Sequence, residues 1–198
     1  MPRLPWTPHP ILEIPSKEEQ LALGPERLLE YHERREAAIE REKRDPYRYG
    51  TELPHWKIAD EQLKDHGELL LLGGNRAGKT EFCAKRVAQT LVQNPGAIIW
   101  CLTSNANNSI NNQQAAVHKY IPEEFKKIGH TRTASYRFSQ KNGYPNSAFI
   151  LPNQSKCFFR AWSADLSIVE GQELGLPQDP VEGTHVAGVW ADEEIPLP

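Results

Sequence analysis

The hydrophobic positions of this chain alternate between helical spacing and short unbroken runs. Apolar runs lie at 69–72, 97–102, 148–151, 157–162 and 185–190, and each predicts a strand. Between the first two runs, Phe82, Cys83, Val87, Ala88, Leu91 and Val92 share one face of a helix predicted over 81–93. A second helix is expected from about 107 to 120. This alternation predicts an α/β core with a mostly parallel sheet and flanking helices.

Two further expectations concern the strands. The run at 97–102 lacks polar alternation, which is typical of a strand buried on both faces of a parallel sheet. The runs at 148–151 and 157–162 flank the turn Pro152-Asn153-Gln154-Ser155 and predict a hairpin inserted on the core. Ligand contacts are expected at Thr103-Ser104-Asn105, because they gather at strand ends in open α/β sheets.

The chain divides into three parts by composition. Residues 1–15 carry five prolines and are expected to be extended, and 16–53 form a charged helical segment or linker. Ser16 and Glu19 predict a capping box, Gly24 a break, and Asp45-Pro46 the end of a helix with Glu30–Arg34 and Glu40–Arg44 pairs. Residues 54–198 form the main domain, which begins with an amphipathic segment around Trp56.

Charge is distributed unevenly, although the net charge is only −3. Residues 119–160 contain 8 Lys or Arg and 2 acids, whereas 161–198 contain 8 acids and no Lys or Arg. The basic block is either a nucleic-acid contact or a set of solvated loop charges. The separated cysteines at 83, 101 and 157 are typical of buried thiols. Without a signal peptide or long apolar span, a soluble intracellular protein with no membrane partner is expected.

The strongest motif follows the run at 69–72. Residues Gly73-Gly74-Asn75-Arg76-Ala77-Gly78-Lys79-Thr80 match G-x-x-x-x-G-K-[ST], between a predicted strand and a predicted helix. Such a phosphate-binding loop (P-loop) turns backbone N–H groups around a di- or triphosphate, aided by the helix N-terminus. Lys79 is expected on the β- and γ-phosphates and Thr80 on Mg²⁺. The pattern predicts ATP and Mg²⁺ as cofactors.

A second motif closes the last predicted strand. The strand at 185–190 is followed by Ala191-Asp192-Glu193-Glu194. Asp192 is expected to hold the same Mg²⁺ as Thr80, through its water shell. Glu193 is expected to polarise the water that attacks the γ-phosphate. Together the two motifs predict an ATP-hydrolysing site.

These residues carry a family resemblance over about 54–196. The loop with Asn75-Arg76 resembles the arginine-bearing Walker A loop of phage terminase large subunits, the ATPases that pump DNA into procapsids. The Trp56 region, the hairpin and Trp190-Ala191-Asp192-Glu193-Glu194 are also similar to that family. The resemblance implies an ASCE or RecA-like P-loop NTPase fold and a homo-oligomeric ring. It also implies double-stranded DNA, portal and terminase small subunit as partners, and a location in the host cytoplasm.

For the site, the resemblance implies that Lys79, Thr80, Asp192 and Glu193 have the roles given above. It adds Arg76 as a group that contacts the γ-phosphate or senses its loss, with a loop arginine held by local carbonyls as the alternative. In that family, the strand that ends in the Asp-Glu pair is called the Walker B strand, and a further strand lies between it and the P-loop strand. This chain ends at Pro198 without that strand or the nuclease domain, so a fragment is expected.

Three functions remain open on the sequence. The first is the terminase motor domain, with DNA contacted by basic-block residues such as Lys126, Lys127, Arg132, Arg137 and Lys141. The second is another P-loop ATPase, for instance a helicase-like enzyme. The third is a truncated protein that binds nucleotide without turning it over.

Overall fold

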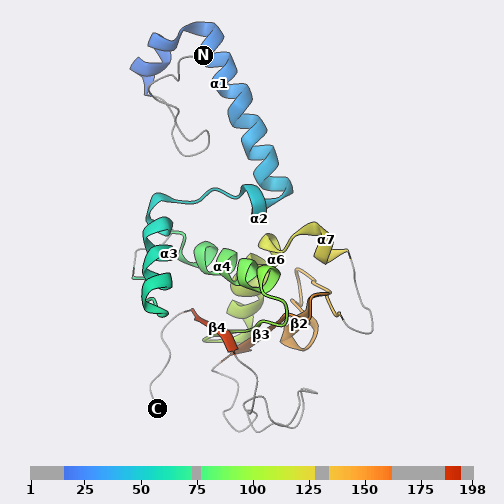
Figure 1. Ribbon diagram of the computed structural model, residues 1–198. Coiled ribbons are helices and arrows are strands. Elements are labelled where there is room, and N and C mark those ends of the chain that lie inside the picture. The colour runs from blue at the N-terminus through green and yellow to red at the C-terminus, as the bar shows by residue number, and fades with distance from the viewer. Residues whose placement is uncertain (1–15, 73–76, 128–133, 162–185, 193–198) are drawn as a thin grey trace. The chain divides into compact units, whose positions relative to one another are not determined.

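The computed structural model describes residues 16–72, 77–127, 134–161 and 186–192 (Figure 1). The chain forms two compact units, residues 1–58 and 59–198, and each is described by itself. The division falls inside one helix, α3 (Pro54–His66). No helix of the described ranges is both long enough and apolar enough to cross a membrane.

The first unit is built on the long helix α1 (Lys17–Arg44) and the short helix α2 (Pro46–Tyr49). The predicted capping box is confirmed, since the Ser16 hydroxyl accepts from the Glu19 N–H and the Glu19 carboxylate accepts from the Ser16 N–H. Gly24 interrupts the helical backbone with φ 74°, as predicted. Glu30 pairs with Arg34, whereas Glu40 pairs with Lys43 rather than with Arg44. No α1 residue is buried, which is typical of a charge-stabilised surface helix.

In the second unit, a four-stranded mixed sheet has the order β2 (Ala148–Ile150), β3 (Lys156–Ala161), β1 (Ile98–Thr103) and β4 (Val186–Ala191). β1 pairs in parallel with both β3 and β4, and β2 pairs with β3 in an antiparallel hairpin. The predicted α/β class is confirmed. The prediction that the hairpin is an insertion is wrong, because β3 lies inside the sheet and shares six register positions with β1.

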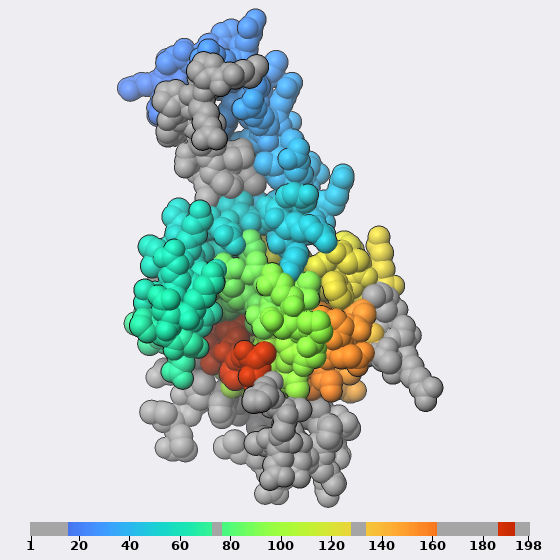
Figure 2. Space-filling model, viewed as in Figure 1, coloured from blue at the N-terminus to red at the C-terminus, as the bar shows by residue number. Residues whose placement is uncertain are grey.

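Helices cover one face of this sheet (Figure 1). They are α4 (Lys79–Gln93), α5 (Ala106–Asn108), the π-helical turn η1 (Ser109–Gln114), α6 (Ala115–Tyr120) and α7 (Glu123–Lys126), with the 3₁₀ turn η2 (Pro145–Ser147) preceding β2. α4 packs against α6, β1 and β4, and Figure 2 shows the green residues of α4 beside the red residues of β4. The region 107–120, predicted to be one helix, is helical, but the π-helical turn η1 separates α5 from α6.

Burial alternates along β1 and β3 instead of being continuous. Ile99, Cys101 and Thr103 are buried, whereas Ile98, Trp100 and Leu102 are half-buried. The prediction of a strand buried on both faces is therefore wrong, because only the helix-covered face is fully enclosed. On the other face, the Arg160 guanidinium lies 5.3 Å from the Trp100 ring centroid, and burial lowers the pKa of Arg160.

A cluster of rings, the aromatic cluster, fills the space at the β2–β3 end of the sheet. Its members, which contact one another at ring-centroid distances of 4.2 to 6.3 Å, are His118, Tyr136, Phe138, Tyr144, Phe149 and Phe159. The sequence of residues 129–147 is polar, basic and turn-rich. Its described part instead contributes two buried tyrosines, whose hydroxyls lie 2.7 Å apart.

The predicted strand at 69–72 is absent. Residues 69–72 form no strand, and Leu70 and Leu72 are 80% and 84% exposed. β4 lies at the edge of the sheet, and none of the strands in the described ranges pairs with its outer side. An apolar segment without a ladder partner does not form a strand, which accounts for the difference.

Candidate functional site

The glycine-rich motif ends where α4 begins. Gly78 caps the helix in the left-handed conformation, at φ 75° and ψ 18°, and its cap carries no side-chain hydrogen bond. Only glycine adopts this backbone conformation without a steric cost, because it has no Cβ. Lys79 and Thr80 are the first two helical residues, so the helix N-terminus follows directly on the motif. Ala77 is also described, whereas Gly73, Gly74, Asn75 and Arg76 lie outside the described residues.

The second predicted half of the site lies at the end of β4. Asp192 follows Ala191, and its backbone N–H donates to the Leu102 carbonyl at 2.9 Å. The negative charge of Asp192 influences the pKa of Cys83, a residue of α4 that lies about one helical turn after Thr80. Burial raises the pKa of the Cys83 thiol to about 12, with the negative charge of Asp192 as the next contribution. α4 packs against β4, so Asp192 follows a strand that contacts the helix carrying Thr80, while Glu193 is outside the described residues.

Thr80 and Asp192 offer a hydroxyl and a carboxylate, the oxygen ligands that Mg²⁺ prefers. No group of three or more His, Cys, Asp or Glu residues able to hold a metal occurs in the part of the chain that the structure describes. A phosphate-bound Mg²⁺ needs only one or two protein ligands, because phosphate and water oxygens complete its shell. The donor set thus fits a magnesium–nucleotide complex rather than a metal site built by protein alone.

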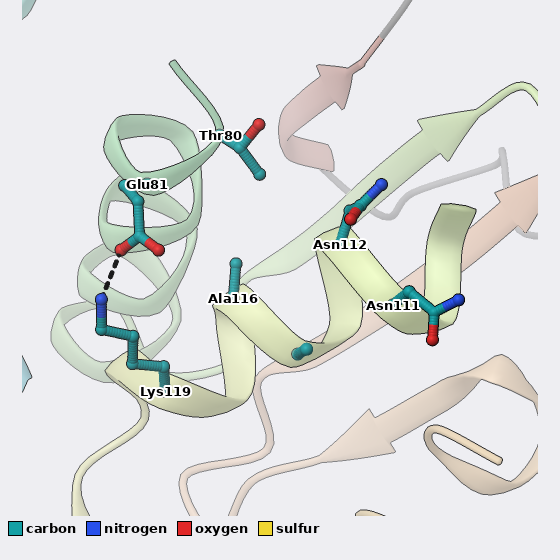
Figure 3. Close-up of a pocket in the computed structure, with 7 residues that line it drawn as sticks. Thr80, Glu81, Asn111, Asn112, Ala116 and Lys119 are labelled. Carbon is teal, nitrogen blue, oxygen red and sulfur yellow. Dashed lines mark hydrogen bonds and ion pairs between the residues drawn. The ribbon is translucent and has the colours of Figure 1, made fainter. Parts of the chain in front are cut away.

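A pocket of about 390 Å³ opens beside Thr80. It lies between the first turn of α4 and the η1–α6 segment, and its lining is Thr80, Glu81, Asn111, Asn112, Ala115, Ala116 and Lys119 (Figure 3). At its side, the Glu81 carboxylate accepts from the Lys119 ammonium at 2.7 Å and from the Tyr120 hydroxyl at 2.5 Å. These two bonds fix the first turn of α4 against α6.

The residues that η1 contributes to this pocket were not predicted from the sequence. Asn111 and Asn112 face this pocket from η1, whereas the next two residues, Gln113 and Gln114, are 0% and 1% exposed. Four consecutive amide side chains inside a predicted helix were the available signal, because buried amides need specific partners. π-Helical turns also occur frequently at functional sites.

The predicted ligand contacts after β1 have local partners in the structure. Thr103 is 2% exposed. Asn105 caps α5 by accepting from the Asn108 N–H at 2.9 Å, and the Ser104 hydroxyl accepts from the side-chain amides of Asn105 and Asn108. These contacts order the loop at the same edge of the sheet as Asp192, but they do not test the ligand prediction.

The basic block does not form one uniform surface. Lys126 pairs with Glu123 at 2.7 Å, and its side chain is only 17% exposed. Lys127, Arg137 and Lys141 are exposed, whereas Arg132 lies outside the described residues. The DNA-contact assignment stays a prediction.

Comparison of the chain with protein-family models, with curated proteins and with solved structures finds no match.

Proposed function

We propose that this chain is the ATP-binding and ATP-hydrolysing P-loop domain of a DNA-packaging motor of the phage terminase large-subunit type. The observation that supports it best is the convergence of the two motifs on one helix. Gly78, in its left-handed conformation, directly precedes Lys79 and Thr80 in the first turn of α4, and this helix packs against β4, the strand that Asp192 follows. A P-loop ATPase site requires both groups together.

In this proposal Lys79 and the N-terminal N–H groups of α4 bind the β- and γ-phosphates of ATP. Thr80 and Asp192 hold Mg²⁺, which when bound neutralises charge on the phosphate oxygens. Glu193 orients and polarises the attacking water, and Arg76 contacts the γ-phosphate. The pocket beside Thr80 leaves solvent space next to the proposed phosphate site.

The motor assignment rests on the terminase resemblance of the loop and of the Trp190 to Glu194 segment. With this assignment we also propose double-stranded DNA as the substrate, the portal and the terminase small subunit as partners, and a homo-oligomeric ring that acts in the host cytoplasm. The exposed basic residues Arg137 and Lys141 are candidates for phosphate contacts with DNA. A helicase-like ATPase would share the nucleotide chemistry, so packaging of DNA into procapsids is the assay that separates the two.

The nucleotide assignment is tested with Lys79→Ala. We expect the variant to bind a fluorescent ATP analogue at least about tenfold more weakly, because a charge-assisted phosphate contact is lost. Lys127→Ala, which removes an exposed lysine outside the motif, is the matched control and should bind as the wild-type chain does. Unchanged binding by Lys79→Ala would contradict the phosphate-loop assignment.

Turnover is tested separately with Glu193→Gln. This variant should keep nucleotide binding and lose hydrolysis, since the amide cannot accept a proton from water. Hydrolysis that survives the substitution removes Glu193 from its proposed role. Binding without hydrolysis by the wild-type chain would favour the nucleotide-binding protein without turnover.

A further inference from the structure

We propose that Gln113 is a positioning residue for the magnesium-binding half of the site. Through the carbonyl of Leu102, Gln113 holds the end of β1 to which Asp192 is bonded. The inference rests on the proposed function, because it takes Asp192 to be the magnesium-binding carboxylate.

One carbonyl oxygen joins the three residues. The Gln113 side-chain amide donates to the Leu102 carbonyl at 2.9 Å, and the Asp192 backbone N–H donates to the same oxygen at 2.9 Å. A carbonyl oxygen has two lone pairs and accepts both bonds. Leu102 and Ala191 form the last paired position between β1 and β4, so Gln113 acts where the ladder ends.

The hydrogen bond from Gln113 to Leu102 matters because it lies beside an edge strand. β4 is an edge strand, and Val186 and Val189 on it are 47% and 62% exposed. The ladder with β1 therefore supports β4 from one side, among the strands that the structure describes. Metal ligands must be held within about 0.5 Å of their productive positions. A bond that fixes the last rung before Asp192 restricts the carboxylate where edge strands tend to fray.

The Gln113 amide is only half paired, which favours a positioning role over a purely stabilising one. Gln113 is fully buried, yet its Oε1 has no hydrogen-bond partner in the described ranges. An unpaired buried acceptor costs free energy, and an apolar side chain of similar shape would avoid that cost. Buried polar groups kept at a cost to stability are expected where function needs them.

The neighbouring residue Gln114 provides the contrast. Its amide nitrogen donates to the Ser109 hydroxyl at 3.0 Å, and its Oε1 accepts from the Tyr144 N–H at 2.8 Å. Both polar atoms of Gln114 are therefore paired, and they connect η1 to the aromatic cluster rather than to β1. The two residues have the same side chain, the same turn and the same burial, but they contact different parts of the fold.

The experiment compares Gln113→Met with Gln114→Met in the whole chain. Binding of the fluorescent ATP analogue mant-ATP is measured with and without Mg²⁺, and thermal melting is recorded on the same samples. For Gln113→Met we expect the Mg²⁺ concentration at half-maximal enhancement of binding to rise about two- to tenfold, as the loss of one hydrogen bond allows. Magnesium-free binding and the melting temperature should be unchanged, or the melting temperature raised. Gln114→Met should lower the melting temperature and leave the Mg²⁺ dependence unchanged.

Two results overturn the proposal. One is a wild-type Mg²⁺ dependence in Gln113→Met, and the other is a loss of folding in Gln113→Met like that of Gln114→Met, which would make Gln113 merely structural. Asp192→Ala separates this failure from a failure of the proposed function. It should abolish the Mg²⁺ enhancement altogether. If Asp192→Ala keeps the enhancement, the assignment of Asp192 to magnesium is contradicted, and the inference about Gln113 falls with it.

Discussion

The two ends of the sheet differ in how completely they are enclosed. At the β2–β3 end, Phe149, Leu151 and Phe159 are at most 1% exposed. At the β4 edge, Val186 is 47% exposed and Val189 is 62% exposed. Both ends come from similarly apolar sequences, so composition does not explain the difference. What differs is the presence of a partner layer, because the aromatic cluster covers one end and no described strand pairs with the outer side of the other.

The enclosed end of the sheet and the candidate catalytic residues therefore lie in different places. Four rings of the aromatic cluster, those of Tyr136, Tyr144, Phe149 and Phe159, are at most 3% exposed, whereas Asp192 lies at the end of the edge strand β4. Thr80 also lies on that side, at the start of the helix that packs against β4. Substitutions at the two ends should therefore affect different properties.

The largest expected effect is the loss of a ring from the aromatic cluster. Phe149→Ala removes a side chain that contacts Tyr136, Tyr144 and Phe159 and should lower the free energy of unfolding by about 3–5 kcal/mol. Val189→Ala at the β4 edge should change it by about 0.5 kcal/mol or less. Urea unfolding followed by circular dichroism measures both. Equal losses at the two ends would show that the β4 edge is as well packed as the cluster.

Two glycines provide a smaller version of the same comparison. Gly143 has φ +67°, and a Cβ placed there would lie 2.1 Å from the Oε1 of Gln114, so Gly143→Ala combines backbone strain with a clash. We expect a loss of about 2 kcal/mol or more, since left-handed backbone alone costs about 1–2 kcal/mol. Gly188 in β4 has nothing within 4 Å of such a Cβ, so Gly188→Ala should be neutral or slightly stabilising. Thermal melting of both variants decides this, and a neutral Gly143→Ala would rule out the close approach to η1.

The elements that were predictable from the sequence have short-range signals. The capping box at Ser16, the helix after Gly78 and the turn between β2 and β3 each depend on residues within a few positions of one another. The place of β3 inside the sheet depends on its pairing with β1, which lies more than fifty residues earlier. No local pattern records such pairing, and the hairpin was therefore taken for an insertion.

The same limit applies to the candidate site. Gly78, Lys79, Thr80 and Asp192 could be predicted as site residues because each lies in a motif that is contiguous in the sequence. Gln113 was not singled out, because a run of four amide residues does not record which of them is buried or which strand carbonyl it donates to. The burial of Tyr136 and Tyr144 was not predictable for a related reason, since the residues around them in the sequence are mostly polar and basic.

The smallest of the three expected effects is a pH dependence that belongs to the β2–β3 end. The His118 ring stacks on Phe138 at 4.2 Å, and its Nδ1 lies 2.8 Å from the Tyr136 hydroxyl. Burial lowers the pKa of His118 to about 4, helped by the positive charge of Lys126 and opposed by Glu123. Between the unfolded pKa of about 6.5 and about 4, the unfolded chain binds a proton that the folded chain does not. Stability should therefore fall as the pH falls through this window and be independent of His118 above it.

The measurement is the melting temperature of the wild-type chain and of His118→Gln between pH 7.5 and 4. The variant carries no titrating group at this position, so its melting temperature should fall less steeply than that of the wild type below about pH 6.5. Since His118 is only half-buried, solvent screening reduces the effect below what the full pKa difference allows. Parallel curves for the two proteins would mean that His118 binds its proton equally well in the folded and unfolded chains, which would contradict the lowered pKa.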